Sequence, residues 1–580
     1  MDLHLPHRDA GPADREARLE KKREQYRFAY DWPPGVATSA ELPKQDDYSK
    51  LYLLESAKVY FDVGVNVAAM AIEGHQAGEL LKLLEERFRD MSAKALHEHV
   101  FRTPRDVAAT LPPRRPNSWD EYRAFFATWE QTPVIATYDD EQMRNESFAW
   151  QRVAGVNPMV LRRCDAIPDN LGVDAALFQR VMGENDSLDA CIAEERLYIA
   201  DYAILDGVPT GKTLNIQKYL AAPIALFAAP KGGRRLLPVA IQLGQTPDAA
   251  IFTPSDGWRW RVAMMHTRIA DANVHEGVAH LGRTHMVMEA VKLCMERQLD
   301  EKHPLHRLLD AHVETTLAIN HSAKTSLIAP DGTVDHCFAP TIEAFAGVVK
   351  KALDTYPISE ATPRKDLEAR GLMNTEALDN PYRDDVLLVF EAVERFVREY
   401  ISVFYESDAD VTGDLELQAF VRELGASDGG RLTGVPSVDT VDELVDLIAT
   451  FVQIAGPGHS AVNFAQFPYM GFVPNMNGAS YEPVPGADLP DEEASLTAML
   501  PPLRPALEGV TMVYFLSHVR STKLGHYAPF HFRSHQASKA VHGFQRHLKS
   551  IEGIIDERER DRFLPYPFLK PSLVLQSISI

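Results

Sequence analysis

Three histidines stand at five-residue intervals in one segment of the chain: His275, His280 and His285. Imidazole is the commonest protein ligand for metals, so this series is a candidate metal site. In an ordinary α-helix a five-residue step rotates by about 500°, which leaves successive side chains about 140° apart. Two of these histidines could hold one ion only if the helix widened locally into a π-bulge, a feature frequent at functional sites. Gly277 and Gly282 would ease that widening.

A second candidate lies far downstream, where His459 is followed four residues later by Asn463. Residues at i and i+4 face the same way on a normal helix. Imidazole nitrogen with amide oxygen is a plausible ligand set for iron and is less typical of zinc. The chain then ends on Ile580, after an apolar and β-branched run, although termini are usually polar and frayed. This end is either a tail packed against the body or a terminal carboxylate carried inside to bind a metal.

Histidine alone is weak evidence, because the chain contains 21 histidines and a single one is usually a surface or satisfied core residue. Glu276 follows His275 directly, but the next histidine comes one residue too late for the HExxH pattern of zinc proteases. The spacing therefore disfavours a zinc hydrolase with Glu276 as general base. The metal interpretation depends on these histidines occurring together with Asn463 and Ile580.

The elements that must position these side chains are mainly helical. Few breakers and apolar residues at three- and four-residue steps predict long helical runs over 258–329, 384–405, 438–454 and 496–519. A further helix is predicted over 75–89, and β-like runs at 197–199 and 236–241 predict a small sheet beside the helices. Residues 470–490 are rich in Pro, Gly and Asn and are predicted to be loop. No fixed-period repeat occurs, which favours one large helical domain over a solenoid.

Composition limits the partners. The 580 residues carry 60 basic and 82 acidic side chains, a formal net charge of −22 that argues against nucleic acid as a partner. The four cysteines form no CxxC pair, and the N-terminus has no apolar segment typical of a signal peptide. There is also no uninterrupted apolar stretch of the ~20 residues needed to span a bilayer. We expect a cytoplasmic protein with reduced thiols and at most peripheral membrane contact; the oligomeric state stays open.

Taken together, the motifs resemble those of the lipoxygenases, most clearly over 157–580. That family shows a His-x4-His pair, a later His-x3-Asn and a C-terminal isoleucine whose carboxylate binds iron. The residues that match these ligands here are His280, His285, His459, Asn463 and Ile580. His275 precedes the pair as a non-ligand. Segments 303–309 and 463–469 are similar to two further conserved stretches of the family.

The resemblance implies a mostly α fold, with a large single helical catalytic domain and a small β element. Residues 1–44 are interpreted as a charged N-terminal extension and 45–580 as the catalytic domain. Plant and animal members carry an N-terminal β-barrel domain. No run of regularly spaced strands precedes the helices here, so we expect that domain to be absent, as in bacterial members.

The same resemblance implies an enzyme that inserts O2 into polyunsaturated fatty acids containing a cis,cis-1,4-pentadiene, with non-haem iron (Fe2+/Fe3+) as cofactor. A hydrogen atom leaves the bis-allylic carbon, and the pentadienyl radical combines with O2. The protein must hold the acyl chain rigidly, exclude water and admit O2 to one face. Beside the metal ligands, Gln466 is expected to link Asn463 to Glu276 by hydrogen bonds.

Four residues are candidates for the substrate pocket. Ala323 corresponds to a position that is alanine in most S-forming members and glycine in many R-forming ones, which predicts an S-hydroperoxide. Phe338 corresponds to the closed end of the pocket and favours the 13-position of linoleate, although plain core packing explains it equally well. Leu327 and Val334 are expected to flank the reacting carbon as apolar walls.

Some features depart from the family or leave alternatives open. A lysine that often precedes the histidine helix corresponds to Met264, and an arginine that in plant members can meet the substrate carboxylate corresponds to Met476. The carboxylate anchor, the substrate direction and the preferred fatty acid, free or esterified, therefore stay open. A fatty-acid hydroperoxide isomerase or lyase, or a manganese-dependent relative, would use the same ligands. A non-catalytic lipid-binding scaffold would have lost at least one ligand, whereas all five are present.

Overall fold

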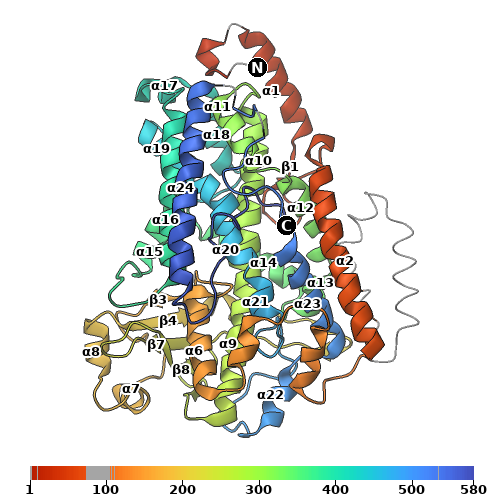
Figure 1. The fold of residues 1–580 in the computed structure, drawn as a ribbon, viewed down its shortest axis with the longest axis vertical. Coiled ribbons are helices and arrows are strands. Elements are labelled where there is room, and N and C mark those ends of the chain that lie inside the picture. The colour runs from red at the N-terminus through yellow and green to blue at the C-terminus, as the bar shows by residue number, and fades with distance from the viewer. Residues whose placement is uncertain are drawn as a thin grey trace.

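The computed structural model describes residues 3–9, 11–73, 105, 108–109, 111–528, 530–532 and 534–580. Helices dominate these residues, and a small sheet lies at one end of the molecule (Figure 1), which confirms the mostly α fold. The predicted helix over 75–89 lies outside the described residues. Before Arg162 the only described strands are the two-residue β1 (Phe28–Ala29) and β2 (Thr38–Ser39), so no strand domain precedes the helices in this part of the chain.

One long helical column runs through the middle of the molecule (Figure 1). It consists of α9 (Gly257–Val274), the π-helix η6 (His275–Met286) and α10 (Val287–Gln298), joined without a break. Nearly every residue of the column is buried, including charged ones. A helix that is buried on every side lies in the centre of a large core, and this column carries the histidines.

Other helices surround this column. They are α1 (Pro12–Gln25), α2 (Lys50–Glu73), α6 (Glu141–Ala154), α7 (Ala175–Met182), α8 (Leu188–Ala193), α11 (Pro304–Asp310), α12 (Thr316–Ser322), α13 (Thr333–Cys337), α14 (Ile342–Asp354), α15 (Pro363–Ala369), α16 (Pro381–Ile401), α17 (Asp408–Gly413), α18 (Leu415–Gly425), α19 (Val441–Gln453), α20 (His459–Asn463), α21 (Gln466–Met470), α22 (Glu493–Met499), α23 (Leu503–His518) and α24 (His535–Glu559). The predicted helical runs 384–405 and 438–454 correspond to α16 and α19. The predicted run 258–329 is one continuous helix only as far as Gln298, where the column ends. Run 496–519 is divided into α22 and α23 at Pro501 and Pro502, because proline cannot donate the helical hydrogen bond.

The sheet covers the end of α9 farthest from the histidines. Its strands are β3 (Arg162–Arg163), β4 (Leu197–Asp201), β7 (Ile224–Ala228), β8 (Leu237–Gln242) and β9 (Ile251–Phe252), in that spatial order and all antiparallel. The predicted strands at 197–199 and 236–241 are β4 and β8. Every residue of β7 is buried, which is typical of a strand covered on both faces.

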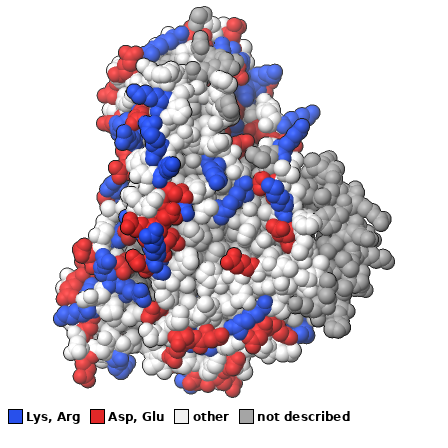
Figure 2. Space-filling model, viewed as in Figure 1, with Lys and Arg blue, Asp and Glu red and all other residues white. Residues whose placement is uncertain are grey.

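Charged side chains attach the N-terminal helix α1 to α18, to α10 and to the segment that follows α10. Arg15 forms an ion pair with Glu416, and Arg18 and Lys22 form ion pairs with Asp300 and Glu296. On the face shown in Figure 2, basic and acidic side chains are mixed rather than gathered into one basic surface. A search of the described helices found none with the length and hydropathy needed to cross a membrane.

Candidate metal centre

The five-residue spacing of the histidines is accommodated by the π-helix η6, which extends over 12 residues. Hydrogen bonds in a π-helix join residues i and i+5, so residues five apart lie nearly above one another. The ring centroids of His280 and His285 are accordingly only 4.8 Å apart. A Cβ added to Gly282 would meet the carbonyl oxygen of Gly277 at 2.9 Å and the Cβ of Ala352 on α14 at 3.3 Å. The helix is thus widened as the spacing predicted, and Gly282 is also required by close packing.

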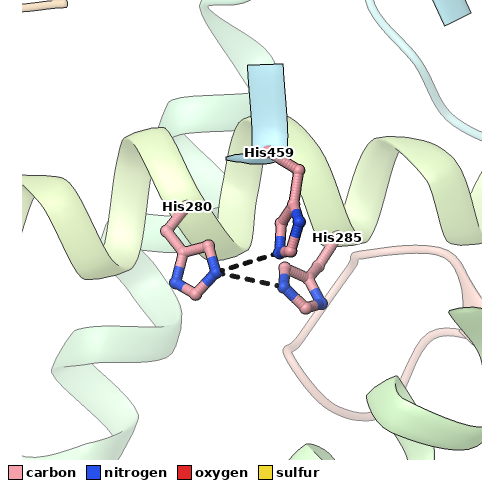
Figure 3. Close-up of side chains that lie close together, drawn as sticks. All are labelled: His280, His285 and His459. Carbon is pink, nitrogen blue, oxygen red and sulfur yellow. Dashed lines mark hydrogen bonds between the residues drawn. The ribbon is translucent and has the colours of Figure 1, made fainter. Parts of the chain in front are cut away.

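Three imidazoles meet at one buried point. The Nε2 atom of His280 lies 3.3 Å from the Nε2 atoms of both His285 and His459, and Figure 3 shows the three rings pointing toward one another. Nitrogen ligands about 2.1 Å from an ion lie roughly 3.0–3.4 Å from each other in octahedral or tetrahedral geometry. The three side chains are 0–4% exposed. Their spacing therefore fits a single metal ion without rearrangement.

The outer nitrogens of two rings have oxygen partners. His285 Nδ1 lies 2.7 Å from Asn320 Oδ1, and His280 Nδ1 lies 3.3 Å from Glu276 Oε2. An oxygen acceptor at Nδ1 keeps the proton there and leaves the Nε2 lone pair free for a metal. Burial lowers the pKa of His285 to about 3 and the pKa of His459 well below its usual value, so both rings are neutral at pH 7.

His275 is turned to a different partner. Its Nε2 atom lies 2.9 Å from the carbonyl oxygen of Val462, where it donates a hydrogen bond, and burial lowers its pKa to about 4. Its Nδ1 atom lies 3.7 Å from Glu276 Oε2. His275, Glu276 and His280 could form a second three-residue metal group, but it would need the same His280 ring. The structure thus keeps His275 out of the three-histidine cluster.

A second π-helix places His459. The π-helix η9 (Ile454–Gly458) packs against η6, contains Pro457 and is followed at once by α20, which begins at His459. Asn463, at the other end of α20, is fully buried. Its Nδ2 atom donates to the carbonyl oxygen of Leu516 over 2.8 Å, and its Oδ1 atom accepts from Gln466 Nε2 over 3.0 Å. The Asn463 amide is therefore oriented by two partners on neighbouring helices.

Gln466 is expected to join Asn463 to Glu276, and the structure shows its hydrogen bond to Asn463. Gln466 contacts the Asn463 amide, whereas Glu276 contacts the rings of His280 and His275. Within the part of the chain that the structure describes, the Oε1 atom of Gln466 has no hydrogen-bond partner. Glu276 therefore acts on the histidines directly rather than through Gln466.

The C-terminal tail enters the core. Ile580 is 1% exposed, and its main-chain oxygen lies 3.1 Å from His459 Nε2. His312 Nδ1 donates to the carbonyl oxygen of Gln576 over 2.9 Å, and the amide of Leu575 donates to Ser460 Oγ over 3.1 Å. The terminal residue thus lies in the core beside the imidazoles, and binding of a metal by its carboxylate stays a prediction.

Glycine leaves the room that this tail needs. A Cβ on Gly456 of η9 would lie 2.8 Å from the carbonyl oxygen of Leu575, a separation that real Cβ atoms essentially never show. The tail can therefore run against η9 only because residue 456 has no side chain.

The four predicted pocket residues are buried, and one of them, Phe338, lines a cavity formed by the described residues. Ala323 and Leu327 begin and end the π-helix η7 (Ala323–Leu327), and Val334 lies in α13. Phe338 follows α13 and lines a cavity of ≈ 420 Å³. This cavity is also lined by Cys337, Met470, Val473, Met476, Asn477, Gly478, Tyr481, Pro501, Pro505, Ala506, Gly509, Val510, Met512 and Val513. Ala323, Leu327 and Val334 lie outside that lining.

Sequence reasoning missed two residues that orient the site. Asn320 binds the outer nitrogen of His285, and His312 holds the tail at Gln576. Both side chains are at most 2% exposed. Their polarity within an apolar neighbourhood was visible in the sequence, but their partners are 35 and 264 residues away. No local pattern predicts such pairings.

Comparison with known proteins places these features in context. A family model described as Lipoxygenase matches residues 117–565. Linoleate 9/13-lipoxygenase of Pseudomonas aeruginosa is 37% identical over 485 residues, covering 80% of this chain and 70% of that protein. Hydroperoxide isomerase ALOXE3 of Homo sapiens is 31% identical over 480 residues, covering 80% of this chain and 66% of that protein.

Solved structures agree over the whole chain. The crystal structure of coral 8R-lipoxygenase matches with a TM-score of 0.87 at 25% identity, covering 100% of this chain and 83% of that one. A delta413-417:GS LOX in complex with arachidonate matches with a TM-score of 0.86 at 25% identity, covering 100% and 84%.

Proposed function

Because the chain belongs to the lipoxygenase family and is a fatty-acid dioxygenase, we propose that it converts acids with a cis,cis-1,4-pentadiene into S-hydroperoxides. Linoleate is proposed as a substrate, oxygenated mainly at carbon 13, with non-haem iron as cofactor. The predicted iron ligands are His280, His285, His459, Asn463 and Ile580. The observation that carries the proposal is the convergence of three buried imidazole Nε2 atoms beside the C-terminal residue.

Some residues of the site would bind the iron, and others orient the side chains that bind it. Bound iron would supply the one-electron chemistry that removes a hydrogen atom from the bis-allylic carbon. Glu276 and Asn320 accept from the outer nitrogens of His280 and His285 and so fix the orientation of both rings. The cavity lined by Phe338 is apolar over most of its lining, which suits an acyl chain and would exclude water from the radical.

Oxygen uptake with linoleate, followed together with conjugated-diene absorbance, tests this function directly. Iron and manganese are measured on the same sample, because a manganese-dependent relative would use the same ligands. Uptake with diene formation by iron-loaded protein supports the proposal. A protein with verified iron that gives neither signal would contradict it.

The second candidate is a hydroperoxide isomerase, which the relative from Homo sapiens favours. It predicts consumption of a fatty-acid hydroperoxide without net oxygen uptake. Incubating the same iron-loaded preparation with 13-hydroperoxy-linoleate separates the two activities.

We predict an S-configured product. The resemblance to the family assigns Ala323 to the position of the alanine of S-forming members, and Ala323 is buried at the start of η7. A methyl group there would shield one end of the pentadiene from O2. Chiral chromatography of the reduced product measures the configuration, and a mainly R product would show that Ala323 does not act in this way.

Replacing Phe338 by valine should move oxygenation away from carbon 13. The smaller side chain lengthens the cavity, so the methyl end of linoleate can enter farther and the 13:9 product ratio should fall by about tenfold, the discrimination expected for a change in pocket size. Phe420→Val is the matched control, because Phe420 is equally buried on α18 and is not among the residues that line this cavity. Equal product ratios in wild type and Phe338→Val would remove Phe338 from the pocket.

A further inference from the structure

A fully buried lysine, Lys218, contacts the main chain of Phe338, which lines the cavity described above. Lys218 is 0% exposed, and among the described residues no carboxylate lies within ion-pair distance of its ammonium group. The cost of burying an unpaired charge is high unless polar groups replace water around it. Hydrogen-bond acceptors must therefore surround the Lys218 ammonium group in place of water.

The acceptors are main-chain carbonyls at the end of α13. Lys218 Nζ donates to the carbonyl oxygens of Asp335 and Phe338, the latter over 2.5 Å. The last carbonyls of a helix have no partner within the helix and carry a partial negative charge, so a cation binds well there. Lys218 thus closes the C-terminal end of α13 and holds the main chain at Phe338.

The same segment is held by the hairpin that carries Lys218. The strands β5 (Lys212–Thr213) and β6 (Ile216–Gln217) form this hairpin. Thr213 Oγ1 donates to the carbonyl oxygen of His336 over 2.6 Å, and the amide of Gly211 donates to the carbonyl oxygen of Ala339 over 2.9 Å. Lys218 is the member of this set that binds Phe338 itself.

We propose that Lys218 is a positioning residue that sets the depth of the acyl pocket by holding Phe338 at its wall. The proposal rests on the proposed function, because it assigns the cavity lined by Cys337 and Phe338 to the acyl chain. Loss of the ammonium group leaves two buried carbonyls without their donor, and the end of α13 then moves away from the cavity. The pocket deepens, and oxygenation shifts from carbon 13 of linoleate toward carbon 9.

The charges that face Lys218 agree with a fixed ammonium at neutral pH. Burial lowers its pKa to about 8, while Asp335, Cys337 and Glu508 act in the opposite direction. Lys218 therefore remains mainly protonated at pH 7 and can donate to both carbonyls.

The variant Lys218→Met tests the proposal, since methionine keeps the apolar stem and removes the charge. We expect the 13:9 product ratio with linoleate to fall at least about threefold. Thr213→Val is the matched control: it removes a hydrogen bond from the same hairpin to the same segment and leaves Phe338 held, so its ratio should equal that of wild type. In a Phe338→Val background, Lys218→Met should add no further change, because Lys218 acts through Phe338.

The outcomes separate this proposal from the proposed function. A wild type that forms no conjugated diene contradicts the function itself. If wild type forms diene and Lys218→Met keeps its ratio, or if the two substitutions add independently, only the role of Lys218 is overturned. If Lys218→Met does not fold, Lys218→Gln is the second variant, because its shorter and uncharged side chain cannot supply the ammonium to both carbonyls. The 13:9 ratio should again fall, and an unchanged ratio overturns the proposal.

Discussion

Deletion of Ile580 is expected to yield a folded protein that has lost most of its iron and at least about 100-fold of its activity. The terminal residue supplies the predicted carboxylate ligand, and its main-chain oxygen already lies 3.1 Å from His459 Nε2. Without it the site keeps three imidazoles and one amide, a weaker ligand set that lacks the negative charge of the carboxylate. Iron content per chain and oxygen uptake measure the two effects separately.

The shortened tail cannot compensate by sliding inward. One residue spans at most about 3.6 Å, so the new carboxylate of Ser579 would have to advance by that distance. The tail is fixed upstream of this point, since His312 holds the carbonyl oxygen of Gln576 and the amide of Gln576 donates to the carbonyl oxygen of Thr522. Leu575 is also held, because its amide donates to Ser460 Oγ over 3.1 Å.

Ile580→Val is the matched control for this deletion. It keeps the carboxylate and changes only the side chain, so it should bind iron as wild type does and lose little stability, because isoleucine to valine costs about 0.5–1.5 kcal/mol in a core. A deletion variant that retains full iron content would show that the tail only packs against the body. Iron loss in Ile580→Val equal to that of the deletion would point to the side chain instead of the carboxylate.

The helix around the histidines shows what sequence can reveal about the site. Two histidines five residues apart do not share a face of an α-helix, so a shared metal predicted local widening, and a π-helical segment is found at His275–Met286. No spacing in the sequence indicated the second π-helix, η9. Pro457 within 454–458 is typical of a helix end, whereas the structure continues the helix through it in a segment that packs against η6.

The large helices leave a periodic pattern of apolar residues in the sequence. This holds also for α24, which the sequence analysis did not predict. In α24 the buried residues are Ala537, Ala540, Val541, Phe544, Leu548, Ile551 and Ile555. These positions recur at three- and four-residue steps, so the signal was present in the sequence. The pocket was harder, because Leu327 and Val334 were placed by resemblance alone, and neither lines the cavity at Phe338. Cavity walls depend on packing between distant segments, which local patterns do not encode.

Asn320 is the clearest case of a residue that only the structure reveals. Its Oδ1 atom lies 2.7 Å from His285 Nδ1, and its Nδ2 atom donates to Glu289 Oε2 over 2.8 Å and to the carbonyl oxygen of His285 over 3.1 Å. One amide thus satisfies the ring and the main chain of a predicted iron ligand, and a buried carboxyl group as well. Loss of this amide would let the His285 ring turn. It would also remove the Asn320 donor from the His285 carbonyl oxygen and from the Glu289 carboxyl group.

We therefore expect Asn320→Leu, which keeps the approximate size of the side chain, to weaken iron binding about 10- to 100-fold, the usual cost of losing a partner that orients a ligating histidine. Competition with a chelator measures the affinity, and the melting temperature measures the stability. Asn475→Leu is the control, because Asn475 is an equally buried amide bonded to Gln151 and Tyr469, away from the three imidazoles. Both variants should melt at lower temperature, since each leaves buried polar groups unpaired. Only Asn320→Leu should also lose iron affinity, and equal affinities in the two variants would reduce Asn320 to a structural residue.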